Sequence, residues 1–232
     1  MANNIQLITI DLDDTLWECM PVIELAEEIL YDWLAKNFPK IVGRYSINDM
    51  RNRRFKLLER RPCLTHDLSL LRRESLRLHA KEFGYSEDAV AEGGFDVFIE
   101  ARNRVILFAG VSVALEQLKN DYTLISLTNG NADVQAIGIA HWFDFSLSSA
   151  AVGKAKPHPA MFQEALRLSG VGSKQAVHVG DDPLNDVQGA REMGMKTVWV
   201  NHLKRPWPKH KQKADASIQH FSELPRLLES LS

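Results

Sequence analysis

Four short segments of the chain concentrate side chains of types that do chemistry. The first and last carry carboxylates, the second a hydroxyl beside an amide, and the third ammonium groups. In chain order they read Asp11-Leu12-Asp13-Asp14-Thr15-Leu16, Thr128-Asn129-Gly130, Gly153-Lys154-Ala155-Lys156-Pro157 and Gly180-Asp181-Asp182-Pro183-Leu184-Asn185-Asp186. A carboxylate can attack an electrophilic centre or carry a proton, and an ammonium group can neutralise an anion.

Each of these segments follows a short run of residues that predicts a buried strand. The runs are apolar and rich in β-branched residues, and we expect strands at residues 7–10, 123–127, 145–148 and 176–179, with a fifth at 197–200. In open α/β sheets, ligands bind beyond the carboxyl ends of the strands. The sequence therefore predicts that the four segments converge on one site.

That convergence would crowd several carboxylates together, and they would repel one another unless a hard cation neutralised them. Magnesium fits this requirement, because it takes oxygen ligands and usually combines one or two carboxylates with a substrate phosphate. We therefore expect Mg²⁺ as the cofactor.

The strands alternate with candidate helices near residues 113–118, 132–139, 160–168 and 184–193. This alternation predicts right-handed crossovers and an α/β fold with a mostly parallel, doubly wound, Rossmann-like sheet. Residues 17–107 interrupt the pattern with apolar residues at steps of three and four and no convincing strand. A connection that long carries structure of its own. We predict a catalytic core of residues 1–16 and 108–232 and an inserted all-α cap, or lid, of residues 17–107.

The order Asp-x-Asp-x-Thr, Thr-Asn, Lys and Gly-Asp-Asp resembles that of the haloacid dehalogenase-like hydrolase superfamily. The third motif reads Gly-x-x-Lys-Pro-x-Pro-x-x-Phe from Gly153 to Phe162, and it looks like the phosphatase and phosphomutase branch with a helical lid after the first motif. The resemblance covers the chain outside the lid, where only position and helicity match.

The resemblance implies a phosphatase in which Asp11 is the nucleophile and becomes an aspartyl-phosphate. Asp13 would protonate the leaving oxygen and then deprotonate the attacking water, with its backbone carbonyl on the metal. Lys156 would neutralise the nucleophile and the transferring phosphoryl group.

The resemblance also assigns the binding residues. Thr128 and Asn129 would hold the phosphoryl oxygens together with Lys156. Asp186 would support the metal from behind, through a bound water or the residues that ligate it. The expected metal ligands are Asp11, Asp13 and Asp181.

Two assignments within the site stay open. The position after Asp181 is commonly Ser or a small residue in this branch, and here it is Asp182, so either carboxylate could touch the metal. Asp181 is favoured because it directly follows the strand. Lys154 competes with Lys156 for the phosphate, and the register of the Gly-x-x-Lys-Pro pattern favours Lys156.

For other polar residues, a purely structural role is an alternative to a functional one. Single histidines at strand and helix ends, such as His178, are expected to pack or to cap. Trp17 and Glu18 could contact the leaving group or pack where the chain enters the lid. The cations of the lid form either a solvated helix face or a basic surface that attracts an anionic substrate. They include Arg44, Arg51, Arg53, Arg54, Lys56, Arg60 and Arg61.

Bulk properties exclude several classes of partner. A net charge of −2 argues against a general nucleic-acid binder. No apolar run approaches the ~20 residues that span a bilayer, so no membrane partner is expected. Cys19 and Cys63 are too few for a disulfide framework, and no signal peptide is visible, which favours the cytoplasm. The expected partner is a small phosphorylated metabolite, and a monomer or a homodimer would fit.

The favoured activity is Mg²⁺-dependent hydrolysis of small phosphate monoesters. Residues 199–201 and the segment from Ala214 to Pro225 look like bacterial members that dephosphorylate flavin mononucleotide or a phosphorylated riboflavin precursor. They look almost as much like relatives acting on nucleotides or sugar phosphates. A phosphomutase keeps the same motifs, and a non-catalytic binding protein on this fold is a further alternative. A dehalogenase is disfavoured, because those relatives lack an acid at the position of Asp13.

Overall fold

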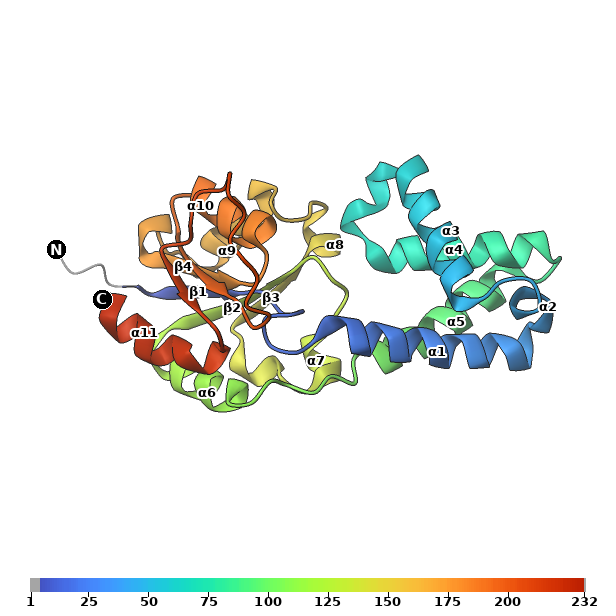
Figure 1. Cartoon of the computed structure of the whole chain (residues 1–232), viewed down its shortest axis with the longest axis horizontal. Helices are drawn as coiled ribbons and strands as arrows, with labels where there is room; N and C mark the ends of the chain where they lie inside the picture. The colour runs from blue at the N-terminus through green and yellow to red at the C-terminus, as the bar shows by residue number, and fades with distance from the viewer. Residues whose placement is uncertain (1–4, 232) are drawn as a thin grey trace. The chain divides into compact units, whose positions relative to one another are not determined.

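The computed structural model describes residues 5–231, which divide into two compact units. One unit comprises Met1–Glu18 and Ile106–Ser232 and contains the sheet, and the other comprises Cys19–Val105 and is helical (Figure 1). Among the described helices, none combines the length and the apolar character that crossing a membrane requires.

The sheet has six parallel strands in the order β3-β2-β1-β4-β5-β6. Their bounds are β1 Leu7–Ile10, β2 Thr123–Thr128, β3 Phe145–Ser148, β4 Ala176–Gly180, β5 Lys196–Val200 and β6 Ala216–Ile218. From β1 the chain adds β2 and β3 on one side, and it then adds β4, β5 and β6 on the other side. The strand order therefore reverses between β1 and β4, where open α/β sheets bind ligands. The predicted doubly wound α/β fold is confirmed.

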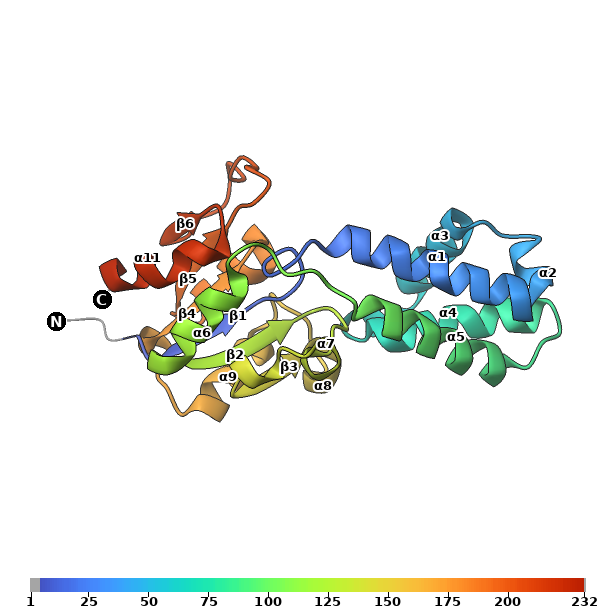
Figure 2. The ribbon, with the colours of Figure 1, turned by 90° about the horizontal axis from the view of Figure 1, so that it is seen from below.

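Helices cover both faces of this sheet, with α6 and α11 on one and α9 and α10 on the other (Figures 1 and 2). The remaining short helices of the unit are α7 and α8. The bounds are α6 Val111–Asp121, α7 Val134–Ile137, α8 Ser149–Val152, α9 Pro159–Ser169, α10 Gly189–Glu192 and α11 Leu224–Leu231. The apolar face of α9 packs Met161 and Phe162 against Leu7 of β1 and Ile125 of β2, and all four side chains are buried. This packing fixes the central strands that carry the site.

Two predicted helices are shorter or more irregular than the sequence indicated. The helix expected at 132–139 is only α7, because Gly138 adopts a left-handed backbone with φ 86° and ends it. The helix expected at 184–193 is a π-helical turn at Pro183–Gln188 followed by α10. Asp182 begins that turn by accepting hydrogen bonds from the amides of Leu184 and Asn185.

The helical unit consists of five helices and a short 3₁₀ turn at Pro62–His66. The helix bounds are α1 Cys19–Asn37, α2 Pro39–Val42, α3 Ile47–Arg60, α4 Leu68–Glu82 and α5 Glu87–Arg102. Its core joins Leu30 and Leu34 of α1, Leu76 of α4, and Phe95 and Phe98 of α5. The recurring apolar steps that predicted helices in this region are the residues that fill this core.

A second feature of the helical unit is a buried carboxylate surrounded by guanidinium groups. Glu27 is 5% exposed and pairs with Arg51 and Arg54 at 2.6 Å and with Arg72 at 3.3 Å. Burial alone would raise the pKa of Glu27, but the guanidinium groups lower it. The guanidinium of Arg72 also lies 3.4 Å from the centroid of the Phe98 ring. Two of the lid cations, Arg51 and Arg54, therefore form ion pairs with a buried carboxylate and do not belong to a solvated helix face.

The two segments that lead out of the sheet-containing unit and back into it run side by side. The amide of Phe108 donates to the carbonyl of Leu16 at 2.9 Å. Trp17 and Leu107 form an isolated antiparallel bridge, and Trp17 is fully buried. These contacts hold the end of the first motif against the segment that precedes α6.

Candidate active site

Asp11 lies directly beyond the carboxyl end of β1, where its amide donates to the carbonyl of Val179 on β4 at 2.9 Å. Its carboxylate accepts two hydrogen bonds from side chains. Oδ1 accepts from the ammonium group of Lys156 at 2.7 Å, and Oδ2 accepts from Thr15 Oγ1 at 3.2 Å. Thr15 is fully buried, so this first motif folds back and fixes the carboxylate of Asp11 from within its own loop.

Asp13 is held separately from Asp11 by a buried tryptophan. Its Oδ1 accepts a hydrogen bond from Trp17 Nε1 at 2.9 Å. The amide of Asp14 donates to the carbonyl of Trp17 at 2.8 Å, and Asp14 has a left-handed backbone with φ 59°. Trp17 therefore orients Asp13 as well as packing at the start of the helical insertion, a contact that neither sequence hypothesis included.

Lys156 is the ammonium group that the structure brings to Asp11. It is 4% exposed, and its Nζ donates to Asp11 Oδ1 and to Asp186 Oδ1, both at 2.7 Å. Burial alone would lower the pKa of Lys156, but these two carboxylates raise it, so the group is charged. Lys154 is exposed and makes no such contact among the described residues.

The side chains of the Thr-Asn motif at the end of β2 form hydrogen bonds with nearby backbone groups. Asn129 Oδ1 accepts from the amide of Lys156 at 2.7 Å, and Asn129 Nδ2 donates to the carbonyl of Lys156 at 2.9 Å. Thr128 is buried, and its Oγ1 accepts from the amide of Gly130 at 2.9 Å. The side chain of Asn129 thus positions Lys156, and the expected contact of Thr128 and Asn129 with a phosphoryl group stays a prediction.

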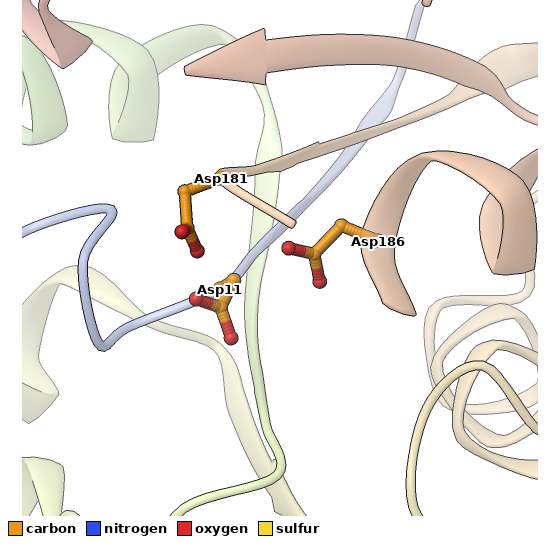
Figure 3. Close-up of side chains that lie close together, drawn as sticks. All are labelled: Asp11, Asp181 and Asp186. Atoms are coloured by element: carbon orange, nitrogen blue, oxygen red, sulfur yellow. The ribbon is translucent and has the colours of Figure 1, made fainter. Parts of the chain in front are cut away.

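Three carboxylates meet at the edge of the sheet (Figure 3). One oxygen from each of Asp11, Asp181 and Asp186 lies within 4.8 Å of the others. Burial and the neighbouring carboxylates raise the pKa of Asp181 to about 9, and burial raises that of Asp11 to about 7 against the opposing charge of Lys156. Both carboxyl groups would ionise more readily beside a cation, and an all-oxygen donor set suits a hard divalent cation. The residues present therefore fit a magnesium ion.

Asp186 differs from the other two members of this cluster because its oxygens are already engaged. It is 1% exposed; Oδ1 accepts from Lys156, and Oδ2 accepts from the amide of Asp182 at 2.9 Å. Burial alone would raise the pKa of Asp186, but Lys156 and His178 lower it. A Cβ atom at position 180 would lie 2.3 Å from the Asp186 carboxyl group, so Gly180 is required for this approach.

His178 completes the chain of contacts behind Lys156, and sequence reasoning gave it no such place. Its Nε2 lies 3.1 Å from Asp186 Oδ1, and its Nδ1 lies 2.8 Å from Thr9 Oγ1. Burial lowers the pKa of His178. The one sequence signal was a polar residue inside the otherwise apolar run that became β4.

Asp182 and Asp181 take different roles in the fourth motif. The carboxylate of Asp182 caps the turn that follows it, accepting from the amides of Leu184 and Asn185, both at 2.7 Å. Asp181 directs its carboxylate toward Asp11, and its carbonyl accepts from Trp199 Nε1 at 2.7 Å. The choice of Asp181 over Asp182 as a metal ligand stays a prediction.

Comparisons with known proteins place the chain in a family. A family model described as haloacid dehalogenase-like hydrolase matches residues 5–194. The chain is 29% identical over 199 residues to 5-amino-6-(5-phospho-D-ribitylamino)uracil phosphatase YigB of Escherichia coli (strain K12), covering 84% of this chain and 83% of that protein. It is 28% identical over 247 residues to glyceraldehyde 3-phosphate phosphatase of Pyrococcus furiosus, covering 98% and 93% of the two chains.

A solved structure described as 2-haloacid dehalogenase from Pseudomonas syringae pv. Tomato DC3000 is 40% identical and superposes with a TM-score of 0.92. The superposition covers 98% of this chain and 100% of that chain. With the family match, this similarity extends through the sheet-containing unit and the helical unit alike. The chain belongs to the haloacid dehalogenase-like hydrolases.

Proposed function

We propose that the protein is a magnesium-dependent phosphatase that hydrolyses small phosphate monoesters through a phosphorylated Asp11. The observation that carries the proposal is the position of Asp11, in contact with the buried ammonium group of Lys156 and within the cluster that it forms with Asp181 and Asp186. The named phosphatases among the relatives support the same reaction class.

Asp11 and Asp181, with the backbone carbonyl of Asp13, would hold Mg²⁺. The ion would supply positive charge to the phosphoryl oxygens and keep the carboxylate of Asp11 ionised at neutral pH. Asp186 holds Lys156 and the Asp182 amide, so it supports the site from behind rather than contributing a free oxygen.

In the first half of the reaction, an oxygen of Asp11 forms a bond to phosphorus while the ester oxygen leaves with a proton from Asp13. In the second half, a water molecule gives a proton to Asp13 and attacks the same phosphorus. Phosphate then leaves, and the carboxylate of Asp11 is restored. Lys156 stabilises the negative charge of the phosphoryl group in both halves. Stabilisation of this charge is the main contribution to catalysis of phosphoryl transfer.

The substrate class is a small phosphorylated metabolite. A phosphorylated riboflavin precursor and flavin mononucleotide are the first compounds to test, because the relative YigB is a phosphatase of 5-amino-6-(5-phospho-D-ribitylamino)uracil and aligns over 84% of this chain. Sugar phosphates follow, because the Pyrococcus furiosus relative is a glyceraldehyde 3-phosphate phosphatase. Substrate choice depends on side chains around the reacting atoms, so the family alone does not fix it.

A dehalogenase is a second candidate, because a solved structure that is 40% identical is described as a 2-haloacid dehalogenase. Cleavage of a carbon–halogen bond releases halide without a proton, so that step needs no acid at the position of Asp13. Asp13 therefore favours the phosphatase.

The test is phosphate release from flavin mononucleotide, sugar phosphates, nucleoside monophosphates and p-nitrophenyl phosphate, with Mg²⁺ or with chelator. Halide release from 2-chloropropionate is measured in parallel. We expect phosphate release that depends on Mg²⁺ and that Asp11→Asn reduces by roughly 10⁴-fold or more, as for loss of a nucleophile. Halide release without phosphate release would replace the proposal by the dehalogenase, and full phosphate release in excess chelator would overturn the metal assignment.

A further inference from the structure

The helical unit contains a polar pocket between α3 and α4, with a volume of about 300 Å³. Every residue that lines it belongs to the Cys19–Val105 unit, so the pocket is complete within that unit. Its polar lining consists of Arg53, Lys56 and Arg60 from α3 and Ser75 and His79 from α4.

His79 is the most unusual of these side chains, because it is 1% exposed and neither ring nitrogen has a hydrogen-bond partner. Its ring packs against Tyr45 with 5.1 Å between the ring centroids. Burial, with help from Arg53, lowers the pKa of His79 to about 4, so the ring is neutral and carries one N–H donor. A buried polar group without a partner is costly, and such groups in native proteins indicate an unseen ligand or water.

A second buried polar group faces the same pocket. Ser75 is 6% exposed and lines the same pocket as His79. A hydroxyl and a neutral imidazole therefore offer two donors from one side of α4. Both lie one helical turn apart, which places them on the same helix face.

The opposite side of the pocket carries positive charge that the fold does not neutralise. Arg53 donates to Glu82 and to Tyr45, both at 2.7 Å. Lys56 and Arg60 are exposed and form no ion pair within residues 5–231. This differs from the buried cluster around Glu27, where each guanidinium contacts the carboxylate. The pocket thus combines two unneutralised cations with a serine hydroxyl and a buried imidazole that has no hydrogen-bond partner.

We propose that this pocket binds a small phosphorylated anion, with Lys56 and Arg60 neutralising its charge and Ser75 donating a hydrogen bond to its oxygens. Because both ring nitrogens of His79 are buried, the ring turns toward the anion to donate a second hydrogen bond. Phosphate oxygens form strong bonds with charged donors, and a dianion matches the two cations. A volume of about 300 Å³ is at the lower end of the range for small-molecule sites, so it also admits a short organic group on the phosphate.

The test is a titration of the full-length protein with inorganic phosphate in chelator, followed by the ring proton and carbon signals of His79 in NMR spectra. His79→Gln assigns the signal. We expect a saturable shift whose apparent Kd rises at least tenfold in the double variant Lys56→Gln/Arg60→Gln. The matched control is Lys36→Gln/Lys81→Gln, which removes two other exposed charges from the same unit and should change the Kd less than twofold.

The source of the phosphate group is tested by a second titration with phenylphosphonate, which the enzyme cannot hydrolyse. Tighter binding than inorganic phosphate identifies an organic phosphate as the ligand, and weaker binding identifies the free anion. Both results support the site. An unchanged His79 signal with both probes would overturn the proposal, as would equal weakening in the two double variants, which would reduce the effect to long-range charge. Neither outcome depends on phosphatase activity.

Discussion

The side chain of Asn129 holds the backbone of Lys156 on both sides, accepting from its amide at 2.7 Å and donating to its carbonyl at 2.9 Å. This clamp joins the loop after β2 to the segment before α9. It directs the Lys156 side chain toward Asp11, although Asn129 itself does not touch the Asp11 carboxylate.

We expect Asn129→Ala to lower kcat/KM by roughly 10- to 100-fold, because a misplaced charge near the reacting phosphate loses much of its effect. Steady-state kinetics with p-nitrophenyl phosphate and Mg²⁺ measure this loss. Asn120→Ala is the matched control, since Asn120 is exposed on α6 and its side chain donates to the carbonyl of Glu116 at 3.1 Å. Equal activity in the two variants would show that the clamp does not position Lys156.

The contact between Trp17 and Asp13 leads to a prediction that depends on the leaving group. Trp17→Phe removes one hydrogen bond to Asp13, worth about 0.5–1.5 kcal/mol, and should slow alkyl phosphate hydrolysis by roughly 3- to 10-fold. An activated aryl phosphate needs less proton donation and should be affected less. Asp13→Asn should show the same pattern with a larger loss.

Rates for an alkyl and an aryl phosphate give the readout for Trp17→Phe. Trp142→Phe provides the control, because Trp142 is also buried and its Nε1 donates to Glu116 at 2.8 Å. A loss that is the same for both leaving groups would argue that Trp17 acts only through packing, and an equal loss in Asp13→Asn would argue that Asp13 is not the acid.

Asp181 makes the stability of the metal-free protein depend on pH. The pKa of its carboxyl group is raised from the ordinary value of 3.8 to about 9 in the folded protein. Between these two pH values, the folded state therefore holds a proton that the unfolded chain has lost. Stability should therefore fall as pH rises from about 4 to about 9, by at most about 1.4 kcal/mol per pH unit, or roughly 3 °C in Tm. Asp11 acts in the same direction only up to about pH 7.

Thermal unfolding in chelator between pH 7.5 and 9 isolates Asp181, because histidines are neutral in that range. Asp181→Asn should flatten the decline, and added Mg²⁺ should flatten it in the unmodified protein. Parallel pH profiles for the two proteins in chelator would contradict the raised pKa.

Glu27 is predicted to be essential to the stability of the helical unit. Glu27→Gln leaves Arg51, Arg54 and Arg72 without their carboxylate and should lower the free energy of unfolding by about 3 kcal/mol. Urea unfolding followed by circular dichroism measures the change. Glu28→Gln on the exposed side of α1 should have little effect, and a similar result for both variants would mean that the buried cluster contributes little.

The strands that carry the site were predictable because each is a short apolar run that ends abruptly at a polar motif. All five predicted strands occur within one residue of their expected bounds. β6 was not predicted, since Ala216–Ile218 is only three residues long and presents exposed Ser217 between its neighbours. Helix α3 falls within the predicted all-α lid, but its bounds were not predicted, because Leu57 is its one buried residue and no buried apolar stripe marks its ends.

The candidate site was predicted in composition but not in its internal contacts. Asp11, Lys156 and Asp181 meet as the motif order indicated, whereas the link through His178 was not foreseen. Thr9 and His178 are paired in the register of β1 and β4, and this pairing depends on a strand order that residue spacing does not reveal. The hydrogen bonds that Asn129 makes to Lys156 likewise depend on how two distant loops fold toward each other.

The bridge between Trp17 and Leu107 means that the helical insertion starts and finishes at one point of its host. No strand pairing of the sheet involves residues 19–105, and the contact between Lys156 and Asp11 lies wholly outside them. The sheet-containing unit therefore requires only that the two ends of the inserted segment lie next to each other. The helical unit is therefore an insertion whose sequence can change without altering the strand pairing or the contact between Lys156 and Asp11.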